Sequence, residues 1–398
     1  MVGQGLDEKV NMHEKHLDHL LEAVAVLQKN TWGEGYTEGI HNNWIRAARK
    51  SGRKFEIERK NNHPYIKFFR KDSSYIGEID PWKLPATPLS SSRICASKIQ
   101  TQYFLENAGV STPWSVLFEK GEMEKARDEA FKRDKEVVVK AHNLSQAIGV
   151  FLHVDEAGFE KTFEECVSIQ ENRKRNPRVI VQELMHGFEL RCTVIEGELV
   201  NVLARIPAYV IGDGSSTILQ LIEEKNERRE SDRFLRKRRI KPEEMNLQAK
   251  LKADGRSLDM VPDVGQSILL SSISNVGHGG ETANLTDLVS DEIKETATAA
   301  VRAIPGLTTG GVDVMAETLD TSNPRVIEVN SFPHAFLSIY PTYGESVNPL
   351  DMYLRSWLSR DDFENGVWKN WDQSDLDKLA RYYDFYNSKI HILKRLPE

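Results

Sequence analysis

Cysteine is scarce in this chain of 398 residues, which contains only Cys95, Cys166 and Cys192. They are odd in number, lie far apart and offer no C-x-x-C spacing, so we expect reduced thiols in a cytoplasmic protein. No segment approaches the roughly 18 apolar residues that a membrane span needs. The N-terminal stretch MVGQGLDEKVNMHEKH is charged and has no apolar centre, so we expect no secretory signal there.

Two phosphate-binding motifs are also missing. No G-x-x-x-x-G-K-[ST] run exists, which excludes a P-loop, and no G-x-G-x-x-G supports a dinucleotide fold. No Ser-His-Asp or Cys-His set for nucleophilic catalysis is evident. The net charge of −7 argues against a general nucleic-acid binder. We interpret the one basic run, residues 233–241, as a solvated helix face or a clamp on an anionic substrate rather than an RNA site.

The chain has the composition of a globular protein, with 39% apolar and 28% charged residues. Helical spacing runs through residues 9–50 and 97–108, and alternating strands are expected within residues 54–80. Strands are then expected at 137–140, 150–152, 179–183, 190–196 and 199–206, and helices at 155–171, 218–229, 287–303 and beyond 361. This mixture predicts an α+β enzyme of several lobes.

Polar side chains stand on two short β-branched runs, residues 310–314 and 326–330. Successive side chains of a strand alternate between faces, so Glu328 and Asn330 point the same way, and Asp313 can join them from an adjacent strand. Two carboxylates and an amide form an open oxygen site that suits Mg²⁺. The simpler alternative is a strand pair that exposes polar residues to solvent.

Lys140 ends the strand predicted at 137–140, and Lys98 begins the helical segment before it. An ammonium is costly to bury without an anion, and phosphate oxygens would supply one. A lone lysine more simply leaves the sheet into solvent. The loop after Lys140 has a single glycine and is a weak phosphate-loop signal.

Five segments in order carry a resemblance to a known family. They read SKIQTQYFLENAGVSTP from residue 97, VVVKAHNLSQAIGV from 137, VQELMHGFELRCTVIEGELVNVLARIPAYVIGDGSSTILQLIEEKN from 181, SNVGHGGETANLTD from 274 and GGVDVMAETLDTSNPRVIEVNSFP from 310. The chain resembles the ATP-grasp ligases, most closely the branch of cyanophycin synthetase and the bifunctional glutathione synthases. The resemblance covers roughly residues 97–350.

The resemblance implies an α+β ATP-grasp fold that holds the nucleotide between two lobes. The expected division is an N-terminal lobe (1–96), a small lobe (97–190), a large lobe with the metal site (191–358) and a helical tail (359–398). The implied reaction joins a carboxylate to an amine through an acyl phosphate and releases ADP and phosphate. The implied substrates are amino acids or short peptides, and the family suggests a homodimer without nucleic-acid or membrane partners.

The resemblance also implies roles for single residues. Nucleotide contacts fall on Lys98, Lys140, Gln182, Glu183, Leu184 and Glu189. The resemblance implies that Arg191, Arg205 and Asn275 lie near the γ-phosphate and the acyl phosphate. It implies substrate contacts for His278, Gly279 and Gly280. A loop histidine such as His278 is, however, more often simply solvated. Asp313, Glu328 and Asn330 would hold two Mg²⁺ ions, or Mn²⁺ in their place.

Two departures from the family pattern keep alternatives open. Ser271 stands in the stretch where the family usually has an arginine before the S-N-x-x-x-G-G loop. After Asn330, the usual N-x-x-P-G-x-x-x-H is replaced by NSFPHAFLSI, which lacks the glycine and the later histidine. A ligase with a polyamine or thiol acceptor therefore remains an alternative, as does a catalytically silent nucleotide-binding regulator.

Overall fold

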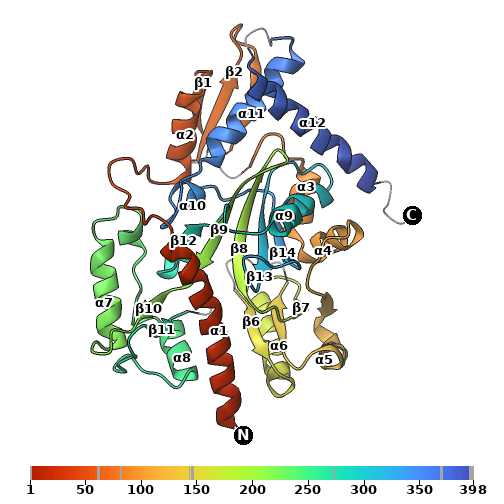
Figure 1. Cartoon of the computed structure of the whole chain (residues 1–398). Helices are drawn as coiled ribbons and strands as arrows, with labels where there is room; N and C mark the ends of the chain where they lie inside the picture. The colour runs from red at the N-terminus through yellow and green to blue at the C-terminus, as the bar shows by residue number, and fades with distance from the viewer. Residues whose placement is uncertain are drawn as a thin grey trace.

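The computed structural model describes residues 2–60, 63–80, 83–142, 144, 148–271, 274–367 and 371–393. Its centre is a five-stranded sheet in the order β12-β9-β8-β13-β14, with every pair antiparallel (Figure 1). The strands are β8 (Phe188–Ile195), β9 (Glu198–Ile206), β12 (Glu281–Asn284), β13 (Gly310–Ala316) and β14 (Arg325–Asn330). The sheet therefore joins segments that are far apart in the sequence.

A second sheet, of four strands, lies below the central sheet in the view of Figure 1. Its order is β4-β7-β5-β6, and its strands are β4 (Ser115–Glu119), β5 (Val137–Ala141), β6 (Val150–Val154) and β7 (Arg178–Glu183). The helices α5 (Met123–Arg133) and α6 (Glu156–Glu171) cover one face of it. Phe159 and Phe163 of α6 are buried there against the valines of β5 and β7.

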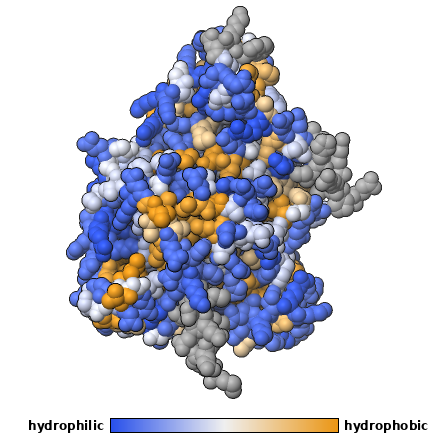
Figure 2. Space-filling view, viewed as in Figure 1, coloured by the Kyte–Doolittle hydropathy of each residue, from blue (hydrophilic) through white to orange (hydrophobic). Residues whose placement is uncertain are grey.

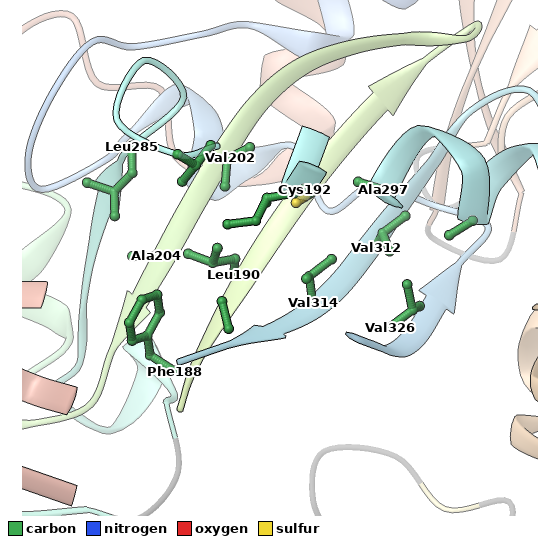
Figure 3. Packing of buried hydrophobic residues seen from close by; sticks show 14 of the residues in the cluster. Phe188, Leu190, Cys192, Val202, Ala204, Leu285, Ala297, Val312, Val314 and Val326 are labelled. Carbon is green, nitrogen blue, oxygen red and sulfur yellow. The ribbon is translucent and has the colours of Figure 1, made fainter. Parts of the chain in front are cut away.

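The central sheet has one apolar face and one polar face. Leu190, Cys192 and Val314 point to the apolar face and are fully buried (Figure 3). The helix α9 (Asp291–Ala303) covers this face and contributes Ala297 to the cluster. The polar side chains of the same strands are therefore left to face the other way.

Residues 40–79 pack against helices from the C-terminal part of the chain, and Figure 1 shows them together at the top of the molecule. Trp44, Phe68 and Trp357 share one buried cluster, in which the rings of Phe68 and Trp357 meet edge to face with centroids 5.6 Å apart. The elements are α2 (Ile40–Lys50), β1 (Lys54–Lys60), β2 (His63–Phe69), β3 (Tyr75–Ile79), α11 (Pro349–Glu364) and α12 (Gln373–Leu393).

The remaining elements surround the two sheets. They are α1 (Val2–Ala25), α3 (Leu89–Ala96), α4 (Lys98–Asn107), α7 (Ile218–Arg229), α8 (Met245–Ala253), α10 (Phe336–Ile339), β10 (Tyr209–Ile211) and β11 (Ser267–Leu269). Among the described residues, no helix combines the length and apolarity that crossing a bilayer requires.

Several predicted elements differ from those observed. The helical spacing across residues 9–50 is wrong for its middle, because residues 26–39 separate α1 from α2 and contain three glycines, one of them at a left-handed φ of 79°. The helix predicted from residue 287 begins at Asp291, since the Ser290 hydroxyl caps it by accepting a hydrogen bond from Ile293 N at 3.4 Å. The helix at 218–229 is confirmed.

Leu190 supports the apolar face of the central sheet and is 0% exposed. Leu190→Ala leaves a cavity in a close-packed region, so we expect the free energy of unfolding to fall by about 2–5 kcal/mol. Chemical denaturation would measure it. Val26→Ala is the matched control because Val26 is 76% exposed. Equal midpoints for the two variants would contradict this description of the core.

Candidate active site

A row of charged residues crosses the polar face of the central sheet. Arg191 of β8 lies opposite Asp313 of β13, and Asp313 lies opposite Glu328 of β14. Asn330 lies opposite Gly311, one step further along the same face. The structure therefore brings together the three oxygen-bearing side chains that the sequence suggested for Mg²⁺.

Each carboxylate in this row is neutralised by a cation. Arg191 holds Asp313 with two hydrogen bonds, from Nε to Oδ1 and from Nη2 to Oδ2, the latter 2.7 Å long. The Lys98 ammonium lies 2.8 Å from Glu328 Oε2. Burial alone would raise the pKa of Glu328, but the charge of Lys98 brings it below its usual range.

A second ion pair lies beside the first. Arg205 of β9 donates from Nη1 to Glu189 Oε1 at 2.6 Å, and its Nη2 lies 4.0 Å from Asp313 Oδ1. Burial, followed by the nearby charge of Asp313, raises the pKa of Glu189 to about 7. Two arginines and two carboxylates thus share one buried patch.

Both arginines keep a buried N–H group that no described acceptor reaches. These groups are Nη1 of Arg191 and Nε of Arg205. Buried donors normally have partners, so a cluster of unpaired guanidinium nitrogens calls for an anionic ligand. Together with the carboxylate and amide oxygens of the row, these donors fit a phosphate group and its metal ion.

Lys140 stands at the end of β5 and is only 8% exposed. Its ammonium donates a hydrogen bond to Gln182 Oε1 on β7, and Gln182 Nε2 in turn donates to Ser115 Oγ at 2.8 Å. Burial, followed by the charge of Lys98, lowers the pKa of Lys140 to about 7. The lysine is therefore buried with a neutral partner, and among the described residues no carboxylate forms an ion pair that would stabilise its charge.

Glu183 ends β7 and has a partner that sequence reasoning missed. Arg325, at the start of β14, holds its carboxylate with two hydrogen bonds of 2.6 and 2.7 Å. The same carboxylate accepts a hydrogen bond from Trp114 N at 3.2 Å. This bidentate pair joins the four-stranded sheet to the central sheet. Leu184 follows directly and begins the connection to β8.

The loop 275–280 leads into the edge strand β12. The Asn275 side chain accepts a hydrogen bond from Gly277 N at 2.8 Å. Gly279 has a φ of 87°, and a Cβ there would lie 2.5 Å from Ile240, so the turn requires glycine. A Cβ on Gly280 would lie 2.7 Å from the carbonyl oxygen of Ile206. The loop is therefore a tightly fitted backbone turn.

His278 in this loop is exposed and contacts a carboxylate outside the charged row. Its side chain is 56% exposed, and its Nδ1 lies 3.1 Å from Glu244 Oε2. These surroundings favour the interpretation that His278 is simply solvated.

His334 is a site residue that sequence reasoning noted only as a departure. It stands where the family has glycine, and it has a left-handed φ of 45°. Burial, followed by the charges of Arg191 and Arg205, lowers its pKa to about 4. His334 is therefore a neutral imidazole close to both arginines. The missing glycine is the sequence signal that could have identified it.

Several cations of the basic run at 233–241 have partners within the protein. Arg238 lies over the ring of Phe234 at 3.8 Å, and Lys237 and Arg239 pair with Glu38 and Glu230.

Ser271, in the stretch where the family pattern has an arginine, interacts with another group of the protein. The two residues after it lie outside the described part of the chain.

The ATP-grasp domain family matches residues 95–335, which is more than half of the chain. The chain belongs to this family, whose ligases use ATP and Mg²⁺. The five-stranded and four-stranded sheets described above both lie within the matched region.

Among curated proteins, the chain is 31% identical over 255 residues to the glutathione biosynthesis bifunctional protein of Listeria innocua, covering 63% of this chain and 32% of the relative. It is 30% identical over 269 residues to the protein of that name from Mannheimia succiniciproducens, covering 64% and 34%. The chain thus spans about a third of the length of these relatives. A crystal structure of a bifunctional glutathione synthetase from Pasteurella multocida shares the fold, with a TM-score of 0.59, 22% identity, and 81% and 43% of the two chains covered.

The buried Lys140 predicts a specific pH dependence of stability. Its pKa is lowered in the folded protein, so between about pH 7 and pH 10 the unfolded chain binds more protons than the folded one. We therefore expect the free energy of unfolding of the parent to rise relative to Lys140→Met across this range, by at most roughly 1.4 kcal/mol per pH unit.

Urea unfolding at several pH values would measure this difference. Lys71→Met is the matched control, because Lys71 is exposed. A constant difference between the parent and Lys140→Met from pH 7 to pH 10 would contradict the buried, uncompensated lysine.

Proposed function

We propose that this protein is an ATP-dependent carboxylate–amine ligase that forms an amide bond and releases ADP and phosphate. The observation that carries the proposal is the charged row of Arg191, Asp313 and Glu328, with buried guanidinium donors beside it that no described acceptor reaches. The family match and the named relatives support the same reaction class. An amino acid or a short peptide is the proposed substrate.

The nucleotide phosphates would bind Lys98 and Lys140. Lys140 is buried and forms no ion pair with a described carboxylate, so a phosphate would supply the missing anion. Lys98 already neutralises the Glu328 carboxylate and would do the same for a phosphate oxygen. Asp313, Glu328 and Asn330 would hold two Mg²⁺ ions, with Mn²⁺ as a substitute. Bound there, the metal would neutralise charge on the phosphates during transfer. Their oxygen donors fit this hard cation.

The adenine would lie at the connection between the sheets, against the backbone of residues 182–184. The carboxylate of Glu183 is already engaged by Arg325, so its role there is to fix the connection. Only the resemblance to the family suggests that Glu189 contacts the ribose. Its pairing with Arg205 means that this contact requires the pair to open.

In the first step a substrate carboxylate oxygen attacks the γ-phosphorus, which yields an acyl phosphate and ADP. In the second step an amine attacks the acyl carbon, and phosphate leaves. Negative charge grows on the oxygens of both transition states, and preorganised donors in a buried site stabilise such charge. Arg191 and Arg205 have the free, buried N–H groups for this task.

We also propose the division into lobes expected from the sequence, with two boundaries moved. The expected boundary at 190/191 cuts β8, which begins at Phe188, and the boundary at 358/359 cuts α11, which begins at Pro349. A single strand or helix belongs to one packing unit, so we place these boundaries before residues 188 and 349. The boundary near residue 96 falls between α3 and α4.

A substrate screen tests the proposed reaction. The protein would be given ATP and Mg²⁺ with pairs of amino acids and dipeptides, and ADP release would be followed together with product masses. We expect a pair-dependent signal with a product mass equal to the sum of the two substrates minus water. ADP release that no pair of substrates stimulates would count against an amide ligase.

The metal assignment can be tested without knowing the substrate. Glu328→Ala removes one carboxylate from the row, so we expect Mg²⁺-dependent ATP binding in calorimetry to weaken by at least about tenfold. Thermal unfolding would verify that the variant is folded. Glu317→Ala is the matched control, because Glu317 is exposed. Unchanged Mg²⁺-dependent binding in Glu328→Ala would refute the proposed role of Glu328.

A further inference from the structure

A cavity of about 470 Å³ lies between α2, the turn of the β8–β9 hairpin, α11 and α12. Small-molecule sites commonly have volumes of this order. Glu196 in the hairpin turn follows Arg191 by five residues on one strand, so roughly 16 Å separates the cavity from the charged row. The elements that meet here gather at the top of Figure 1, away from the four-stranded sheet. The cavity is therefore not part of the proposed nucleotide site.

Cations outnumber carboxylates in the lining, by five side chains to three. Lys50 pairs with Asp351 at 2.6 Å, and Arg355 pairs with Asp375 at 2.7 Å. Lys378 of α12 is different, because no carboxylate of the described chain pairs with its ammonium. It is partly buried, so a ligand anion would find a cation with little competition from protein.

The carboxylate at the floor of the cavity does not oppose an anion. Glu196 is 4% exposed, and Arg360 donates to its Oε1 at 2.6 Å while Ser356 donates to its Oε2. The guanidinium of Arg360 also lies 3.9 Å from the ring centre of Tyr382. Arg360, which does not line the cavity, thus compensates the charge of Glu196, and the net charge of the lining is positive.

Part of the lining is hydrocarbon. Met352 from α11 is partly exposed and contributes apolar surface, whereas Ile195 from the hairpin and Leu354 and Leu358 from α11 are at most 4% exposed. A simple inorganic anion would leave this surface uncovered, and a neutral hydrocarbon would leave Lys378 without a partner. A ligand with an anionic head and an apolar body satisfies both parts of the cavity.

We propose that this cavity binds a small molecule with one carboxylate on an apolar chain, and that Lys378 is the cation that holds the carboxylate. Two kinds of molecule share this chemistry, a short alkyl carboxylic acid and an N-acylated amino acid. The proposal is independent of the amide-forming reaction, because it rests on residues outside the charged row. It adds a second ligand site, formed by the hairpin that carries Arg191 and Arg205 on its strands.

Calorimetric titration of the whole protein without ATP tests the proposal. Hexanoate and N-acetyl-L-leucine are the two carboxylate probes, and 1-hexanol and hexylamine are the neutral and cationic controls. We expect at least one carboxylate to bind at millimolar concentration or tighter, and the stronger probe identifies the kind of ligand. Binding of neither carboxylate, or equal binding of 1-hexanol, would overturn the proposal.

Variants assign the binding to this cavity. Lys378→Met should weaken the carboxylate roughly tenfold, and Lys378→Arg should retain it, because the charge is kept. Lys71→Met is exposed and distant in sequence and should change nothing. ATP binding should be the same in all three variants, which separates this site from the nucleotide site. Carboxylate binding that survives Lys378→Met unchanged would refute the role of Lys378.

Discussion

The site depends on one constraint, which is that its carboxylates must be neutralised whether or not a ligand is present. Asp313 is buried, and an isolated buried charge costs several kcal/mol, so this carboxylate cannot remain uncompensated. Glu328 is partly exposed, and its charge is paired as well. Arg191 and Lys98 neutralise them in this structure. In the proposed function, a metal–nucleotide complex would bring both cations and anions. The carboxylates would then bind the metal while the same arginine and lysine bind phosphate, so ligand binding would exchange one set of ion pairs for another.

The two sheets are linked by the same kind of interaction. Glu183 and Arg325 are separated by 142 positions in the sequence, yet they form a bidentate pair at the ends of β7 and β14. Lys140 is the corresponding charged group on the four-stranded sheet, and burial lowers its pKa to about 7. An anion that reached Lys140 while binding the charged row would stabilise both sheets in one arrangement. In the proposed function, nucleotide binding would therefore be coupled to the relative position of the sheets through these few charged groups.

Local pattern was enough to predict part of this arrangement. The alternation of a strand places Glu328 and Asn330 on one face, and the β-branched runs marked β5, β7, β13 and β14. The register could not be predicted in this way, because Asp313 faces Glu328 only through a pairing interrupted by an irregularity directly after Asp313. The partners of Glu183 and Lys98 lie 142 and 230 positions away in the sequence. Tertiary packing, which a single sequence does not display, decides which residues these partners are.

His334 shows how a departure from a family pattern acquires physical meaning in a structure. A side chain at a left-handed φ is disfavoured by roughly 1–2 kcal/mol relative to glycine, so its surroundings must stabilise the turn. The ring of Phe332 meets the imidazole edge to face at 5.6 Å, and the adjoining Pro333 lies close to Gly311 on β13. The histidine stays neutral beside Arg191 and Arg205, so it adds bulk and hydrogen-bonding capacity without changing the charge of the row. A neutral side chain at this position therefore leaves the charge of the row unchanged. In the proposed ligase, it would change the space offered to a substrate while the groups proposed for the phosphates stay as they are.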